Sequence, residues 1–164
     1  MEKHIVLGVH VTNRIKDAGP VQRLLTEYGV DPKRFIVEIT EEALFDSKRA
    51  ADANLFQLAE MGVGLYVDDF GTGYSSLTHI RDFPITGIKL DQSFTAGLTT
   101  GHARSIELAV VLGDLVQRLG LEGIAEGVET EEQATQLQQY GWQIGQGWLF
   151  GAATPEPQQP LPRA

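Results

Sequence analysis

The sequence contains no cysteine, which excludes disulfide bonds and thiolate metal sites. Any metal site must therefore use oxygen or imidazole ligands. Basic residues are also scarce, 13 against 22 acidic residues, and the formal net charge is −9. Because nucleic-acid polymers bind lysine- and arginine-rich surfaces, we expect no such partner. The lack of cysteine also favours a cytoplasmic location.

Long hydrophobic runs are absent as well. The apolar stretch Ile5 to Val11 is far shorter than the roughly 20 residues that a membrane-spanning helix needs, and no small-residue cleavage site follows it. We therefore predict no membrane association and interpret this stretch as a strand. With 164 residues and 42% apolar content, the chain can bury one core.

The remaining pattern alternates between strand-like and helix-like segments. We predict strands at Ile5 to Val11, Phe35 to Ile39, Val63 to Val67, Thr86 to Leu90, Leu121 to Ala125 and Gln143 to Gly147. Helices are predicted at Pro20 to Tyr28, Ser47 to Met61, Ala103 to Leu119 and Thr130 to Tyr140. In the last of these, Thr130 with Gln133 three residues later forms a capping-box signature, and Gly141 is expected to end the helix in a left-handed conformation. This order predicts a parallel α/β domain over residues 1–150. Residues 151–164 contain four prolines and no periodicity, which indicates an extended or disordered tail.

The most distinctive segment is Asp-Asp-Phe-Gly-Thr-Gly-Tyr-Ser-Ser-Leu at 68–77, which directly follows an apolar strand. Its adjacent carboxylates, Asp68 and Asp69, repel each other unless protons, cations or solvent compensate their charge. A divalent metal ion is the simplest compensation. The sequence therefore predicts a cation site at the end of this strand.

Other polar residues also fall at or near the ends of predicted strands. They are His10, Glu38, Asp68, Lys89 with Asp91, Glu126 and Gln146. A single carboxylate at a strand end is usually a solvated surface group. Because catalytic groups of parallel barrels lie at the carboxyl ends of the strands, the whole set favours one shared pocket.

Several motifs together resemble the EAL domains, bacterial phosphodiesterases that linearise cyclic di-GMP. They are Val-Glu-Ile-Thr-Glu at 37–41, the segment 68–77, Ile-Lys-Leu-Asp at 88–91, Ala-Glu-Gly-Val-Glu at 125–129 and Gln-Gly at 146–147. The likeness extends over nearly the whole chain to about Phe150, in the family's order. It implies a TIM-type (β/α) barrel and a hydrolase that uses two divalent metal ions, Mg²⁺ or Mn²⁺.

The resemblance also implies roles for individual residues. Metal ligands would be Glu38 and Asp68, with Asp69 at a second metal position. Lys89 would hold the attacking water or the developing phosphate charge, and Glu126 would be the general base or a further ligand. Supporting positions fall on Asp91, Glu129, Gln146 and Glu41, of which Glu41 would brace the loop after Asp69. For Glu41 a second interpretation stays open, a helix N-terminal charge that interacts with the macrodipole.

Two departures from the family pattern affect the expected activity. The family is named for a Glu-Ala-Leu motif on a strand near the start of its barrel, and we expect this tripeptide to be absent from the chain, which would begin after that strand. We therefore expect one metal ligand to be missing. Where the family has an asparagine on the next strand, this chain has His10. An imidazole there is either a ligand, better suited to transition metals than to Mg²⁺, or a hydrogen-bonded strand-end histidine.

A complete (β/α)₈ barrel takes about 250 residues, so six strands predict only a partial barrel. Open sheet edges invite pairing, and we expect a homodimer or another association through them. Three functions stay open at this point. They are hydrolysis of cyclic di-GMP, a degenerate receptor or protein-interaction module that does not cleave it, and a remnant that does neither.

Overall fold

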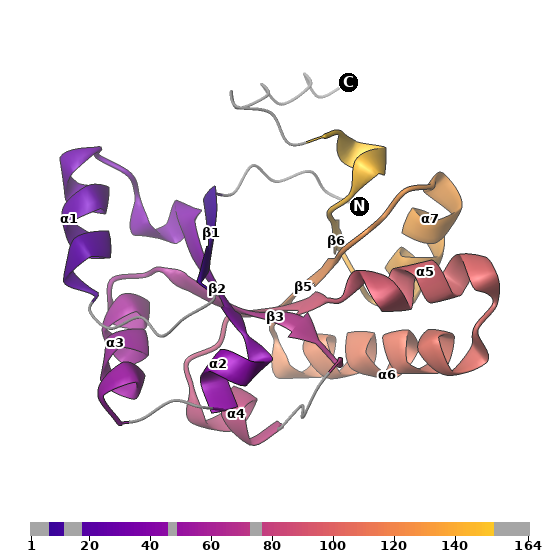
Figure 1. The fold of residues 1–164 in the computed structure, drawn as a ribbon, viewed down its shortest axis with the longest axis horizontal. Coiled ribbons are helices and arrows are strands. Elements are labelled where there is room, and N and C mark those ends of the chain that lie inside the picture. The colour runs from indigo at the N-terminus through magenta and orange to yellow at the C-terminus, as the bar shows by residue number, and fades with distance from the viewer. Residues whose placement is uncertain (1–6, 12–17, 46–48, 73–76, 153–164) are drawn as a thin grey trace. The chain divides into compact units, whose positions relative to one another are not determined.

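Strands and helices alternate along the chain, as the sequence predicted. The computed structural model describes residues 7–11, 18–45, 49–72 and 77–152 (Figure 1). The predicted tail from residue 153 onward lies outside the described residues, as do Ile5, Val6 and residues 73–76. The chain divides into two compact units at the end of β4, and we refer to residues 7–89 as the N-terminal unit and to residues 90–152 as the C-terminal unit.

The N-terminal unit contains the first strands of the chain and the helices between them. Its elements are β1 (Leu7–Val11), α1 (Gly19–Glu27), the 3₁₀ helix η1 (Pro32–Arg34), β2 (Phe35–Thr40), α2 (Glu41–Phe45), α3 (Arg49–Glu60), β3 (Gly64–Phe70), α4 (Leu77–Asp82) and β4 (Gly87–Leu90). The strands follow one another in the sheet in chain order, β1-β2-β3-β4. Neighbours β1 and β2, and likewise β2 and β3, are parallel.

The strand register determines which side chains share a face of this sheet. Glu38 pairs with Tyr66 and Thr40 pairs with Asp68, so Glu38 and Asp68 lie on the same face. Val37, paired with Leu65, alternates onto the other face, where both side chains are fully buried. Helices α2 and α3 contact β3, and their Leu44 and Leu58 are also fully buried. The helices therefore cover the apolar face.

The C-terminal unit is dominated by helices. Its elements are α5 (Gln92–Thr100), α6 (Ala103–Leu119), β5 (Glu122–Ala125), α7 (Glu131–Gln139), β6 (Ile144–Gly145) and the 3₁₀ helix η2 (Trp148–Phe150). Helix α5 packs against α6 and α7, and α6 also contacts β5 (Figure 1). β5 and β6 form a parallel pair, with Ile124 opposite Ile144.

Close contacts to α6 depend on small residues and on one buried tryptophan. The Trp142 side chain is completely buried, and its indole N–H donates to the Ala109 carbonyl at 2.9 Å. A methyl group added to Gly113 would lie only 2.0 Å from the carbonyl oxygen of Tyr140. Gly97 of α5 is equally restricted, because its added carbon would lie 2.5 Å from Ser105 of α6. These glycines allow the backbones to approach closely.

Local sequence signals locate two helices well. Helix α6 has the predicted bounds, and α7 begins with the predicted capping box, in which Thr130 and Gln133 bond reciprocally. Gly141, predicted to end α7 in a left-handed conformation, has φ of +100°. The predicted strand at Gln143 to Gly147 shortens to Ile144–Gly145, and helix α5 was not predicted.

None of the helices in the described part of the chain is long and apolar enough to cross a membrane.

The close approach at Gly113 generates a stability prediction. Alanine favours an isolated helix over glycine by about 1 kcal/mol. We nevertheless expect Gly113→Ala to lower the free energy of unfolding by about 1–3 kcal/mol, because the methyl group must displace the Tyr140 backbone. Chemical denaturation measures this, with Val110→Ala on the exposed side of α6 as the matched control. A stabilised Gly113→Ala variant would contradict this packing.

Candidate active site

A buried lysine joins two carboxylates on the polar face of the N-terminal unit. The Lys89 ammonium lies 3.1 Å from Glu38 Oε1 and 3.0 Å from Asp68 Oδ1. The lysine side chain is 3% exposed and the Asp68 side chain 6%. Burying any one of these charges alone would cost several kcal/mol, so each charge depends on the others. The three groups come from adjacent strands, β2, β3 and β4, which fixes their separation.

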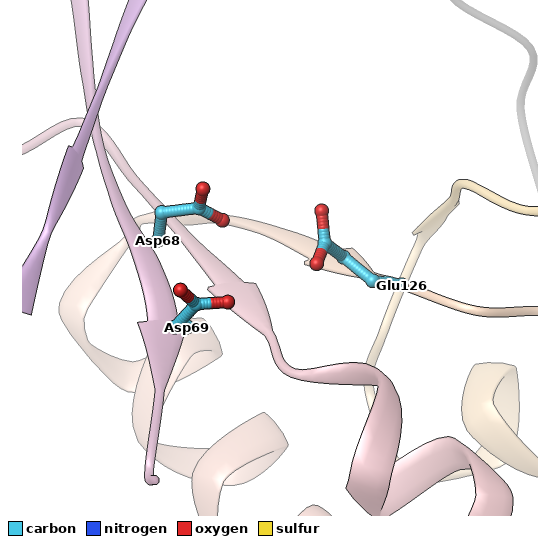
Figure 2. A group of neighbouring side chains, drawn as sticks. All are labelled: Asp68, Asp69 and Glu126. Atoms are coloured by element: carbon cyan, nitrogen blue, oxygen red, sulfur yellow. The ribbon is translucent and has the colours of Figure 1, made fainter. Parts of the chain in front are cut away.

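Among the residues that the structure describes, negative charge exceeds positive charge around this lysine. Its single ammonium faces two carboxylates, and Asp69 follows Asp68 directly, with carboxylate oxygens of the two aspartates within 4.8 Å of one another. Figure 2 shows this pair of side chains on β3. The donors are carboxylate oxygens, which suit hard divalent cations. The donor set and the surplus of negative charge therefore fit a hard divalent cation.

The backbone at Asp69 has an unusual conformation. Its φ is +54°, and it is the one non-glycine residue with positive φ among the described residues. Aspartate tolerates this left-handed region better than most residues do. A turn fixes the conformation, because Thr72 donates to the Asp69 carbonyl from its hydroxyl at 2.8 Å and from its amide at 3.3 Å. Sequence analysis missed Thr72, although its position three residues after Asp69 is typical of such a turn.

The expected ligand His10 lies on β1. Its Cα is the register partner of Glu38 on β2, so the backbone places it beside one of the carboxylates. The His10 side chain lies outside the described part of the structure. A ligand role for His10 therefore stays a prediction.

Glu41 is the first residue of α2, directly after β2, and is 9% exposed. This place at a helix N-terminus agrees with the macrodipole interpretation, while its expected contact with the loop after Asp69 stays a prediction. The letters Glu-Ala-Leu also occur once, at 42–44. They lie within α2 and not on a strand, so the expectation that this tripeptide is absent from the chain is wrong, although no described strand carries it.

The other predicted site residues belong to the C-terminal unit. Glu126 follows β5 and is labelled in Figure 2, and its amide donates to Leu90 O at 3.1 Å. β4 ends at Leu90, so Asp91 lies just beyond the strand and caps α5, accepting from the Ser93 amide at 3.0 Å. This capping function was not foreseen, because helix α5 was not predicted and Asp91 was placed with Lys89 near a strand end.

Glu129 and Gln146 are both exposed. The backbone of Gln146 joins two parts of the C-terminal unit, because its amide donates to Ala125 O at 2.9 Å and its carbonyl accepts from Val128 N at 3.0 Å. Supporting roles for the side chains of Asp91, Glu129 and Gln146 stay predictions.

Comparison with known proteins identifies the family. The model of the family described as "EAL domain" matches residues 5–153. A cyclic di-GMP phosphodiesterase of Pseudomonas aeruginosa, RocR, is 40% identical over 136 residues, which cover 83% of this chain and 34% of that protein. The chain thus spans about a third of this relative's length. The resemblance seen in the motifs is confirmed.

Solved structures agree in fold. A cyclic di-GMP complex of the PaMucR phosphodiesterase matches 90% of this chain and 61% of that chain, with a TM-score of 0.82 and 32% identity. BlrP1 of Klebsiella pneumoniae, solved with manganese and cyclic di-GMP, matches 88% of this chain and 38% of that chain, with a TM-score of 0.77 and 26% identity. The predicted α/β fold of the partial TIM-barrel type is confirmed.

The buried ion pairs generate a prediction about metal binding. In Lys89→Met the carboxylates of Glu38 and Asp68 lose their ammonium partner, which should cost about 3–5 kcal/mol of stability. A divalent cation would replace the lost positive charge. Adding Mn²⁺ should therefore raise the melting temperature of Lys89→Met more than that of the parent.

Thermal unfolding in EDTA and in Mn²⁺ measures both effects. Lys33→Met removes an exposed lysine of the same unit and is the matched control. Equal Mn²⁺ stabilisation of Lys89→Met and Lys33→Met would contradict the replacement of the lysine charge by a cation.

Proposed function

We propose that this chain, which belongs to the EAL domain family, hydrolyses cyclic di-GMP to the linear dinucleotide with the help of divalent metal ions. The observation that carries the proposal is the buried Lys89 between Glu38 and Asp68, with Asp69 beside them. A surplus of carboxylates around one ammonium suits a metal-dependent phosphodiesterase better than a purely structural ion pair. The relatives that are named as cyclic di-GMP phosphodiesterases point to the same substrate.

Glu38, Asp68 and Asp69 would hold the metal ions, with His10 as a further ligand. We propose Mg²⁺ or Mn²⁺, since the described donors are carboxylate oxygens. Bound there, the ions would lower the pKa of a water molecule and stabilise the charge of an in-line displacement at phosphorus. The manganese complex of BlrP1 supports this choice of metal.

The chain's own side chains would handle charge and protons. Glu126 accepts a proton from the attacking water, or acts as a further ligand, and the water oxygen forms the new bond to phosphorus. The bond between phosphorus and one ribose oxygen breaks, and that oxygen takes up a proton, either the one that Glu126 accepted from the water or one from the solvent. The Lys89 ammonium, held by Glu38 and Asp68, balances the negative charge that develops on the phosphoryl oxygens.

The remaining predicted residues would support these groups. Asp91 fixes the start of α5 just after Lys89, and Gln146 fixes the backbone after β5. Glu129 would orient the substrate or the ligands, and Glu41 would brace the loop after Asp69. A cytoplasmic location and association through open sheet edges remain part of the same proposal.

Release of the linear dinucleotide from cyclic di-GMP, in Mn²⁺ and in Mg²⁺, tests the function. We expect turnover by the parent chain and losses of at least roughly 100-fold in Asp68→Asn and Glu126→Gln, because each removes a charge from the reacting centre. Glu107→Gln, which neutralises an exposed carboxylate of α6, should keep parental activity.

The same samples should be titrated with cyclic di-GMP in Ca²⁺. Binding without release of product would favour the receptor alternative, for which the expected loss of the metal ligand of the Glu-Ala-Leu motif is the main argument. Neither binding nor release, in a folded sample, would leave only the non-functional remnant.

His10 generates a separate prediction about metal preference. If its imidazole is a ligand, His10→Asn should shift the ratio of Mg²⁺- to Mn²⁺-supported turnover toward Mg²⁺, because an amide oxygen suits the harder ion. The measurement compares turnover rates at saturating concentrations of each metal, with His102→Asn as the control histidine. An unchanged ratio would remove His10 from the metal site.

A further inference from the structure

Gln133 forms an unusually complete set of hydrogen bonds inside the C-terminal unit. This α7 side chain is 6% exposed. Its Oε1 accepts from the amides of Glu129 at 2.8 Å and Thr130 at 3.0 Å. Its Nε2 donates to Thr99 Oγ1 at 2.9 Å and to the Thr95 carbonyl at 3.4 Å. A glutamine amide offers two donor hydrogens and two acceptor lone pairs, so its capacity is fully used.

A capping box explains only part of this arrangement. In that motif the third helical residue accepts one bond from the N-cap amide, here Thr130, and glutamate serves as well as glutamine. The hydrogen bond from the Glu129 amide and the two hydrogen bonds that Gln133 donates to α5 are not part of the motif. Only an amide can accept from the segment before α7 and also donate to α5. The choice of glutamine therefore points to a connection between the two elements.

The connected segment is the one that follows Glu126. The Glu126 amide donates to Leu90 O at 3.1 Å, and the Val128 amide donates to Gln146 O at 3.0 Å. The next two amides of the chain, those of Glu129 and Thr130, donate to Gln133 Oε1. Hydrogen bonds therefore hold the backbone amides of four of the five residues 126–130, between β5 and α7. Two of these four amides donate to Gln133.

We infer that Gln133 is a positioning residue, which fixes the segment 126–130 against α5 and so holds Glu126 for proton transfer or metal binding. The inference rests on the proposed function, because it assigns Gln133 an effect on Glu126 and not a contact with the substrate. Misplacing a catalytic carboxylate slows the chemical step more than it weakens binding. The inference therefore predicts a lower kcat with little change in KM.

Two variants test this inference in the full chain. Gln133→Leu removes all four hydrogen bonds, and Gln133→Glu keeps the capping box but removes both donors to α5. We expect kcat for cyclic di-GMP hydrolysis to fall roughly tenfold or more in each, with KM within about threefold of the parent. Gln138→Leu and Gln138→Glu, at an exposed position of the same helix, should keep parental kinetics.

A purely structural role gives a different result. Gln133→Glu would then retain parental kcat, because glutamate completes the capping box, and any loss in Gln133→Leu would follow the fraction of folded protein. Circular dichroism measures that fraction at the assay temperature. Parental kcat in Gln133→Glu would overturn the inference.

An inactive parent chain would refute the proposed function but would still leave the inference testable. Amide hydrogen exchange followed by NMR reports directly on the segment. In Gln133→Leu the amides of Glu129 and Thr130 should exchange at least roughly tenfold faster than in the parent, while the Leu137 amide within α7 keeps its rate. Unchanged exchange at Glu129 and Thr130 would overturn the inference without reference to activity.

Discussion

The shared burial of one ammonium and two carboxylates is the constraint on which the candidate site depends. Lys89 is almost fully buried, and such a charge is tolerated only because Glu38 and Asp68 lie within 3.1 Å of it. This requirement links β2, β3 and β4, since a slip of one residue in any strand would send its charged side chain into the apolar face. The strand register therefore also determines which charged side chains meet at the site.

Much of the fold could be predicted from local signals. Helix α6 begins and ends where its apolar periodicity and flanking residues indicate, and α7 begins at its capping box. Helix α5 was missed because its sequence contains Gly97 and three threonines, which form helices poorly in isolation. Its stability comes instead from packing on α6, where Gly97 allows close contact with Ser105. Tertiary packing of this kind is not visible in the sequence.

The candidate site was predictable in its residue types but not in its geometry. Glu38, Asp68 and Lys89 were named from their places at strand ends, and the structure brings these three together. The sequence did not indicate that the lysine would bond both carboxylates, because their distance depends on register. Nor did it reveal the cap formed by Asp91, because helix α5 was not predicted, although β4 ends at Leu90 as expected. The hydrogen bonds from Gln133 to α5 were likewise not predictable, because the bonded residues lie more than 30 positions apart in the sequence.

The left-handed backbone at Asp69 limits which amino acids can occupy that position. Glycine, asparagine and aspartate enter this region at small energetic cost, and longer or branched side chains do so far less readily. Of these three, only aspartate carries a negative charge. Glutamate, the other acidic residue, is disfavoured there by conformation before its charge is considered. The turn fixed by Thr72 thus selects the shorter acid at this place in the chain.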